Sequence, residues 1–267
     1  MQMPTVGTVV LTLALCSAMP LVARAPNVAG PSHEPGRSLP GFVAWAWERE
    51  EDLRFLEGHV ARVAILVATL DLRERAVIEH PRRQPIKVPS GIRTIGVVRI
   101  EARHPEPRLD DDMRRRVRDA ILRFTASPLF DTIQIDFDAA VSARPFYRSL
   151  LADLRAALPT GRRLSMTALA SWCLGDPWVQ DLPVDEIVPM VFQMGADARR
   201  IRNHLARGGD FQPVCRSAIG VATDESLPPL AFTRQTYVFH GRSWDVEAFS
   251  SLVNRTLGDR TPGRDLP

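Results

Sequence analysis

Two aspartates at the end of one predicted strand are the residues best suited to chemistry in this sequence. Side chains alternate between the two faces of a strand, so Gln134, Asp136 and Asp138 share one face of the segment Thr132–Asp138. Carboxylates two residues apart lie roughly 7 Å apart at the backbone, and a partly buried pair cannot easily ionise together. One of them should therefore keep its proton at a raised pKa, as acid-catalysed bond cleavage requires. The structural alternative is that one aspartate pairs with an arginine and the other caps a helix.

The preceding predicted strand brings a charged pair to the same place. Arg99 and Glu101 share one face of Thr94–Glu101. Arg99 either neutralises Asp136, which favours the structural alternative, or holds it ionised beside a protonated Asp138.

More acids and several indoles are expected at the ends of other strands. Carboxylates accept hydrogen bonds from sugar hydroxyls, and flat indole faces stack on sugar rings. Taken one at a time, each of these residues also fits a helix cap, a solvated loop or the core. The acids are Glu48, Asp224 and Glu225, and the indoles are Trp45, Trp47, Trp172 and Trp244.

Short apolar runs alternate with amphipathic stretches from residue 42 onward. The runs are rich in Val, Ile and Thr, as strands covered on both faces should be. The expected strands are Phe42–Trp47, Val63–Leu70, Thr94–Glu101, Thr132–Asp138, Leu164–Ala168, Ile187–Gln193, Ser217–Val221 and Thr236–His240. The expected helices are Glu50–Leu56, Asp110–Phe124, Phe146–Leu158, Ala196–Ala206 and Val246–Leu257.

This alternation predicts an α/β fold, a (β/α)₈ TIM-type barrel over residues 42–258. Residues 71–92 hold three prolines and no helical pattern, so an irregular connection is expected between strands two and three. The alternative is an open doubly wound sheet, but that fold usually has a glycine-rich turn after its first strand, and Trp45–Arg49 contains no glycine.

The ends of the chain have the composition of export and linker segments. Val6–Val22 is mostly apolar and precedes Ala23-Arg24-Ala25, so residues 1–25 are predicted to be a cleaved signal peptide and the protein periplasmic or secreted. A membrane-anchored or lipid-attached N-terminus is the alternative. Residues 26–41 are predicted to be a linker and 259–267 a flexible tail. No membrane span is expected after signal removal.

Composition excludes several classes of function. The chain has 267 residues, 45% of them hydrophobic, and a net charge of only +3, so a large core is feasible and a nucleic-acid partner is not expected. The histidines have no metal-ligand spacing, and there is no phosphate-binding glycine loop or Gly-x-Ser-x-Gly motif. We expect no metal or cofactor, a monomer, and no disulfide between Cys173 and Cys215, which are predicted at opposite ends of the barrel.

Several segments resemble an uncharacterised bacterial family of glycoside-hydrolase-like barrels. The likeness covers most of residues 42–245. It rests on Trp45–Leu56 (WAWEREEDLRFL), Gln134–Ala139 (QIDFDA), Phe146-Tyr147, Leu164–Cys173 (LSMTALASWC), Val188–Gly195 (VPMVFQMG) and Thr223–Glu225 (TDE).

A more distant resemblance is to the chitinase-type family eighteen glycoside hydrolases. Their Asp-x-x-Asp-x-Asp-x-Glu signature falls on Asp131, Gln134, Asp136 and Asp138, so the resemblance implies that Asp138 takes the place of the acid and Asp136 that of its supporting carboxylate. Their Met-x-Tyr-Asp falls on Met190, Phe192 and Gln193. The departures remove groups that orient a substrate acetamido group, the nucleophile in those enzymes.

The sequence therefore predicts a glycoside hydrolase for a cell-surface or extracellular polysaccharide, with Asp138 and Asp136 catalytic. A barrel that binds glycan or protein without catalysis is the alternative. The expected substrate-binding residues are Trp47, Glu48, Arg99, Glu101, Trp172, Met190, Phe192, Gln193, Asp224, Glu225 and Trp244.

Overall fold

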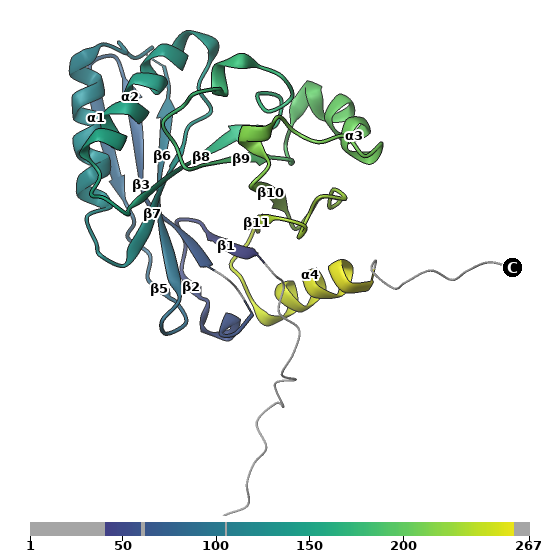
Figure 1. The fold of residues 1–267 in the computed structure, drawn as a ribbon. Coiled ribbons are helices and arrows are strands. Elements are labelled where there is room, and N and C mark those ends of the chain that lie inside the picture. The colour runs from purple at the N-terminus through teal and green to yellow at the C-terminus, as the bar shows by residue number, and fades with distance from the viewer. Residues whose placement is uncertain (1–40, 60–61, 105, 259–267) are drawn as a thin grey trace, which may run out of the picture. The chain divides into compact units, whose positions relative to one another are not determined.

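A closed ring of eight parallel strands forms the centre of the protein (Figure 1). The computed structural model describes residues 41–59, 62–104 and 106–258. The ring closes because β1 pairs with both β11 and β3. The predicted (β/α)₈ barrel and its eight predicted strands are therefore confirmed. In order around the ring, the strands are β1 (Phe42–Ala46), β3 (Arg62–Arg73), β6 (Arg93–Ala102), β7 (Phe130–Asp136), β8 (Arg163–Leu169), β9 (Glu186–Met190), β10 (Ala218–Ala222) and β11 (Gln235–Phe239).

The alternation of side chains along these strands creates two separate cores. The inner core fills the barrel, where the rings of Trp45 and Phe239 lie 4.3 Å apart. The outer core lies between the strands and the segments that cover them, and it contains Ile133, Ile135 and Phe137 of the fourth barrel strand and its end. The expectation that these three apolar residues point away from the lumen is confirmed.

Within the described residues, four α-helices cover the strands. They are α1 (Asp111–Phe124), α2 (Arg144–Ala157), α3 (Ala198–Ala206) and α4 (Val246–Gly258). Each corresponds to a predicted helix, and α1 begins where the side chain of Asp110 accepts a hydrogen bond from the backbone N–H of Met113. The helices α1 and α2 lie side by side on one flank of the barrel (Figure 1). Short 3₁₀ turns complete the connections: η1 (Arg54–Leu56), η2 (Val141–Ala143), η3 (Pro177–Val179), η4 (Gly195–Asp197) and η5 (Pro213–Cys215).

The predicted helix at Glu50–Leu56 is wrong. The segment holds strand β2 (Glu51–Asp52), paired with β5 (Ile86–Lys87), followed by the turn η1. The backbone N–H groups of Glu51 and Leu53 donate to carbonyls of Pro85 and Lys87, so tertiary pairing replaces the helical bonds of a segment too short to form a stable helix alone.

The connection over residues 71–92 lacks a helix, as expected, but it is more regular than predicted. Strand β3 continues to Arg73 and turns at Glu74, whose φ is 45°, and the chain returns as β4 (Ala76–Pro81) in an antiparallel pair with β3. Ladder hydrogen bonds order this hairpin even though it ends in a proline, because Pro81 lies at the last position of the strand. Strands β3 and β6 stay paired as far as Leu72 and Ala102, so they form a wall beside the site.

Cys173 and Cys215 form a disulfide, with Cα atoms 5.9 Å apart, and the expectation that they stay unpaired is wrong. That expectation placed them at opposite ends of the barrel. The connections that carry them meet outside β9, where the backbone N–H of Gln212 donates to the carbonyl of Cys173 over 2.9 Å. A connection folded over the outer surface need not stay at the end of the strand from which it leaves.

The predicted signal peptide, the linker up to residue 40 and the tail from residue 259 lie outside the described residues. Within the described part of the chain, no helix has both the length and the apolar character needed to cross a bilayer.

Candidate functional site

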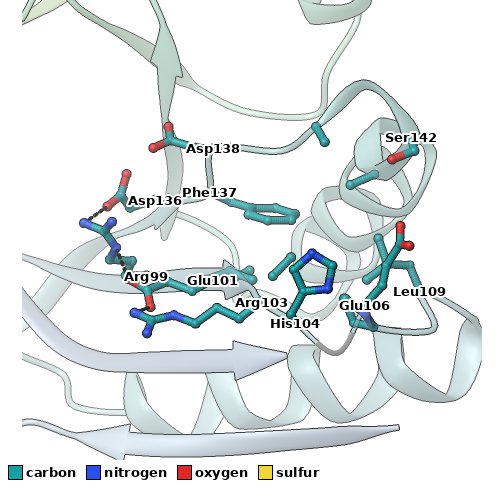
Figure 2. Close-up of a pocket in the computed structure, with 15 residues that line it drawn as sticks. Arg99, Glu101, Arg103, His104, Glu106, Leu109, Asp136, Phe137, Asp138 and Ser142 are labelled. Carbon is teal, nitrogen blue, oxygen red and sulfur yellow. Dashed lines mark hydrogen bonds and ion pairs between the residues drawn. The ribbon is translucent and has the colours of Figure 1, made fainter. Parts of the chain in front are cut away.

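Asp136 and Asp138 lie at the carboxyl end of β7 and point to the same side of the chain, with Phe137 between them pointing away (Figure 2). The shared face predicted for the two aspartates is the arrangement observed. Two adjoining pockets have Asp136, Asp138 and Arg99 in common. The side pocket, of about 520 Å³, is walled by the end of β6, the loop after it and residues 140–143. The mouth pocket, of about 250 Å³, lies over the barrel and is lined from the ends of the other strands.

Both carboxylate oxygens of Asp136 face a donor. The hydroxyl of Thr167 on β8 donates to Oδ1 over 2.6 Å, and Nη1 of Arg99 lies 3.7 Å from Oδ2. Asp136 is only 6% exposed. Burial raises the pKa of Asp136 above its usual value, and the nearby charges of Asp138 and Glu101 add to that rise, while Thr167 and Arg99 oppose it. The contacts thus favour a carboxylate that is ionised when Arg99 is beside it.

Asp138 has a different environment. Within the described part of the chain, no hydrogen bond or ion pair engages its carboxylate, which lies in the wall of both pockets. The residue is exposed, yet the pocket walls remove part of the water around the carboxyl group. This partial burial raises the pKa of Asp138, and the positive charge of Arg99 opposes the rise. An accessible carboxyl group with a raised pKa can deliver a proton to a bound ligand.

Arg99 connects the two aspartates to the neighbouring strand. Its Nε lies 3.0 Å from Oε1 of Glu101, which also pairs with Arg103 (Figure 2). Its guanidinium carbon lies 5.8 Å from the centre of a ring of Trp47. The expected pairing of Arg99 with Asp136 is present. It leaves Asp138 unpaired, so only one of the two aspartates fits the structural alternative.

The mouth pocket gathers six of the expected binding residues. Its lining includes Trp47, Arg99, Met190, Phe192, Gln193 and Asp224. Arg99 lines both pockets, and Glu101 lines the side pocket. Gln193 adopts a φ of 48°, and its backbone N–H donates to Oε1 of Glu225 over 2.8 Å.

Four other predicted residues do not line these two pockets. Trp172 and Trp244 are 3% and 4% exposed and belong to the outer core. Glu48 accepts hydrogen bonds from the backbone N–H groups of Arg83 and Gln84. Glu225 holds the loop of Gln193 and pairs with Arg202. The two indoles lie outside because residues just past a strand can turn back over its outer surface.

Several residues of the site were not anticipated. Thr167 donates a hydrogen bond to Asp136. The alternation of side chains along β8 could have indicated it, because Thr167 lies on the lumen face two residues from Ser165. His240 follows β11 directly and lines the mouth pocket, where its Nδ1 lies 2.7 Å from the hydroxyl of Thr223. Burial lowers the pKa of His240, so its neutral form is favoured.

Gln134 belongs to a polar network deeper in the barrel. Its amide donates to Ser165, which donates to Glu186, and the hydroxyl of Tyr237 donates to the same carboxylate over 2.6 Å. Gln134 and Ser165 are fully buried, so they support the barrel interior and do not reach the pockets. Across residues 41–59, 62–104 and 106–258, no group of three His, Cys, Asp or Glu side chains is placed to hold a metal ion.

Comparison with known proteins gives one family match and several matching folds. Residues 90–198, which include Arg99, Asp136 and Asp138, match a family described as a domain of unknown function, DUF3142. No curated protein matches the chain. Similar solved structures include the spore cortex-lytic enzyme SleL of Bacillus cereus (TM-score 0.45, 14% identity, 81% of this chain and 58% of SleL covered). Another is phosphoribosyl anthranilate isomerase of Thermus thermophilus (TM-score 0.40, 11% identity, 82% and 99% covered).

A protein of Streptomyces coelicolor described as a candidate chitinase A has the same fold as this chain. The TM-score is 0.53 at 10% identity, and the match covers 82% of this chain and 97% of that one. At this identity the likeness concerns the fold alone, so the chain is a barrel of the kind found in that protein.

Proposed function

We propose that this protein is a glycoside hydrolase that acts on a cell-surface or extracellular polysaccharide. The observation that carries the proposal is the pair Asp136 and Asp138, which project together into the junction of two pockets at the carboxyl end of the barrel. Active sites of (β/α)₈ enzymes lie at this end. The barrel likeness to a candidate chitinase supports the same class of substrate.

Asp138 acts as the general acid in this proposal. Its raised pKa makes the protonated form easier to reach than in a free aspartate, and its lack of a protein partner leaves that proton available to the glycosidic oxygen of a bound chain. As the bond to the leaving group breaks, the proton passes to the departing oxygen, and positive charge develops on the sugar ring. A water molecule then bonds to the anomeric carbon and gives up a proton to a carboxylate of the pair, which completes the hydrolysis.

Asp136 acts as the supporting carboxylate. Thr167 and Arg99 favour its ionised form, and a negative charge beside the sugar ring stabilises the positive charge that develops during cleavage. Arg99 is a positioning residue because it acts through Asp136 and Glu101. Trp47 and Phe192 offer ring faces for stacking against sugars.

We also propose that the protein is exported. The disulfide Cys173–Cys215 is of a kind that persists in oxidising compartments outside the cytosol, and this supports a periplasmic or secreted protein. We propose that polysaccharide is the partner and that the protein works as a monomer.

The decisive experiment compares native protein with Asp138→Asn across a panel of purified polysaccharides and oligosaccharides. We expect one glycan to be cleaved by the native protein and the variant to lose roughly 10²- to 10⁴-fold in kcat while still binding it. Asp181→Asn is the matched control, because Asp181 is exposed and its φ of 57° suits asparagine. Binding of a glycan without any cleavage by the native protein would instead establish a non-catalytic binding barrel.

A further inference from the structure

One carboxylate in the mouth pocket, that of Asp224, is held in place without a cationic partner. The residue before it is fixed to β11, because the backbone N–H of Thr223 donates to the carbonyl of Phe239 over 2.9 Å and its hydroxyl contacts His240. The residue after it, Glu225, is fixed to Gln193 and Arg202. Asp224 itself makes no hydrogen bond or ion pair within the described part of the chain, and it lines the pocket.

The other charges around the pocket are already balanced by protein groups. Arg99 lies between Asp136 and Glu101, and Asp197 pairs with Arg200 over 2.9 Å. On the rim, Arg49 donates to the carbonyl of Gly241 and lies 3.9 Å from Glu51. Asp224 interacts electrostatically with His240, but the pKa of His240 is lowered, so its neutral form is favoured. Once Asp138 holds the proton assigned to it above, Asp224 is the acid in this lining that no ion pair engages within the described residues.

Aromatic rings also line the same pocket. The rings of Phe192 and Phe239 lie 4.7 Å apart, and those of Trp47 and Phe239 lie 5.9 Å apart. All three residues line the pocket together with Asp224. A pocket lined by a carboxylate and by aromatic rings is suited to an ammonium group, because ring faces and carboxylate both attract positive charge. A concave site with unbalanced negative charge also raises the local concentration of cations.

We propose that the mouth pocket selects a glycan whose sugars carry free, protonated amino groups. Asp224 pairs with the ammonium group, and Phe192, Phe239 and Trp47 pack against the sugar that bears it. The pairing places an amino sugar beside Asp136 and Asp138, so this inference rests on the proposed glycan-cleaving function for its location. The proposed function does not specify the charge of the substrate, and this inference specifies that it is positive.

The test measures binding of two probes by calorimetry: a glucosamine oligomer with free amines, and the N-acetylated oligomer of equal length. We expect native protein to bind the free-amine oligomer more tightly, and Asp224→Asn to weaken that binding roughly three- to tenfold with little effect on the acetylated oligomer. Asp181→Asn, which removes the same charge from an exposed site outside the pocket, should behave as native protein. Added salt should weaken binding of the free-amine oligomer more than that of its partner.

Equal or tighter binding of the acetylated oligomer, binding of neither oligomer, or a preference that survives Asp224→Asn would each overturn the inference. A thermal melt checks that the variant is folded. Cleavage of a neutral glycan without any preference for amines would sink this inference and leave the proposed hydrolase intact. A preference for amines without cleavage of any glycan would support this inference and contradict the proposed hydrolase.

Discussion

Asp136 is a deeply buried carboxyl group, and this burial makes it a source of both function and instability. The carboxylate is 6% exposed and depends on Thr167 and Arg99 for its ionised form. Its raised pKa means that the folded protein binds a proton more tightly there than the unfolded chain does. As pH rises from the ordinary value of 3.8 through the raised pKa, the folded protein therefore loses stability at this site.

Replacing Asp136 by Asn should remove this dependence on pH. We expect the free energy of unfolding of Asp136→Asn, relative to native protein, to increase between about pH 4 and about pH 7, while activity is lost. Denaturant unfolding at a series of pH values measures the difference, with Asp181→Asn as the control. A difference that stays constant over this range would contradict the assignment.

Thr167 should lower the pKa of Asp136 during catalysis. Thr167→Val removes the donor to Asp136, so the pKa of Asp136 should rise further and the acidic limb of the pH–rate profile should move to higher pH. We expect kcat to fall roughly 10- to 100-fold. Thr167→Ser keeps the hydroxyl and should restore most of the rate. If the profile keeps its position in the valine variant, Thr167 has only a packing role.

At the scale of elements, the connection that carries Cys173 determines how part of the site is held. The segment from β8 to β9 contains Ala170 and Ser171 of the mouth pocket, and the disulfide fastens it to η5 before β10. Neither cysteine is exposed. Closing a loop of this length reduces the conformational entropy of the unfolded chain more than that of the folded one.

Removing the disulfide should therefore lower stability. With a sequence separation of 42, the chain-entropy model gives about 4 kcal/mol for the loss in Cys173→Ser with Cys215→Ser. Chemical denaturation of native and double-variant protein, with and without reductant, measures it. If reductant shifts the unfolding midpoint of the double variant as much as that of native protein, the effect is not due to this bond.

The elements also show what a sequence can and cannot predict. The eight strands were predictable because each is a short apolar run, and the alternation in Thr132–Asp138 correctly oriented Asp136 and Asp138. Strand β4 was missed because its pairing with β3 outweighs the nearby prolines. Irregular connections between strands set the positions of Trp172, Trp244 and the two cysteines. Tertiary contacts determine the paths of such connections, so local sequence patterns could not predict them.

At the scale of the whole barrel, the last helix and the first strand stabilise one another. Phe249 of α4 packs against Phe42 of β1, with ring centres 5.7 Å apart. Trp244, just before α4, donates its indole N–H to the carbonyl of Trp45. Trp244 and Trp45 are 199 positions apart in the chain, so this hydrogen bond holds the end of the barrel sequence against its first strand.

A cavity on the buried face of α4 should weaken the entire barrel. Leu252 of α4 is fully buried, so Leu252→Ala should lower the free energy of unfolding by about 2–5 kcal/mol. The exposed neighbour Ser251 supplies the control, and Ser251→Ala should leave stability nearly unchanged. Thermal melts compare the two. Similar melting temperatures for both variants would show that α4 contributes little to the barrel.

The bond between Cys173 and Cys215 also makes a covalent ring of the chain between them, and that ring includes β9, Phe192, Gln193 and α3. A protease that cuts once inside the ring leaves two fragments that stay joined through sulfur. Such a nicked molecule keeps its full mass until a reductant is added, and the two halves of the barrel can remain assembled. The barrel would in this way survive a single cut in the loop beside its own pocket.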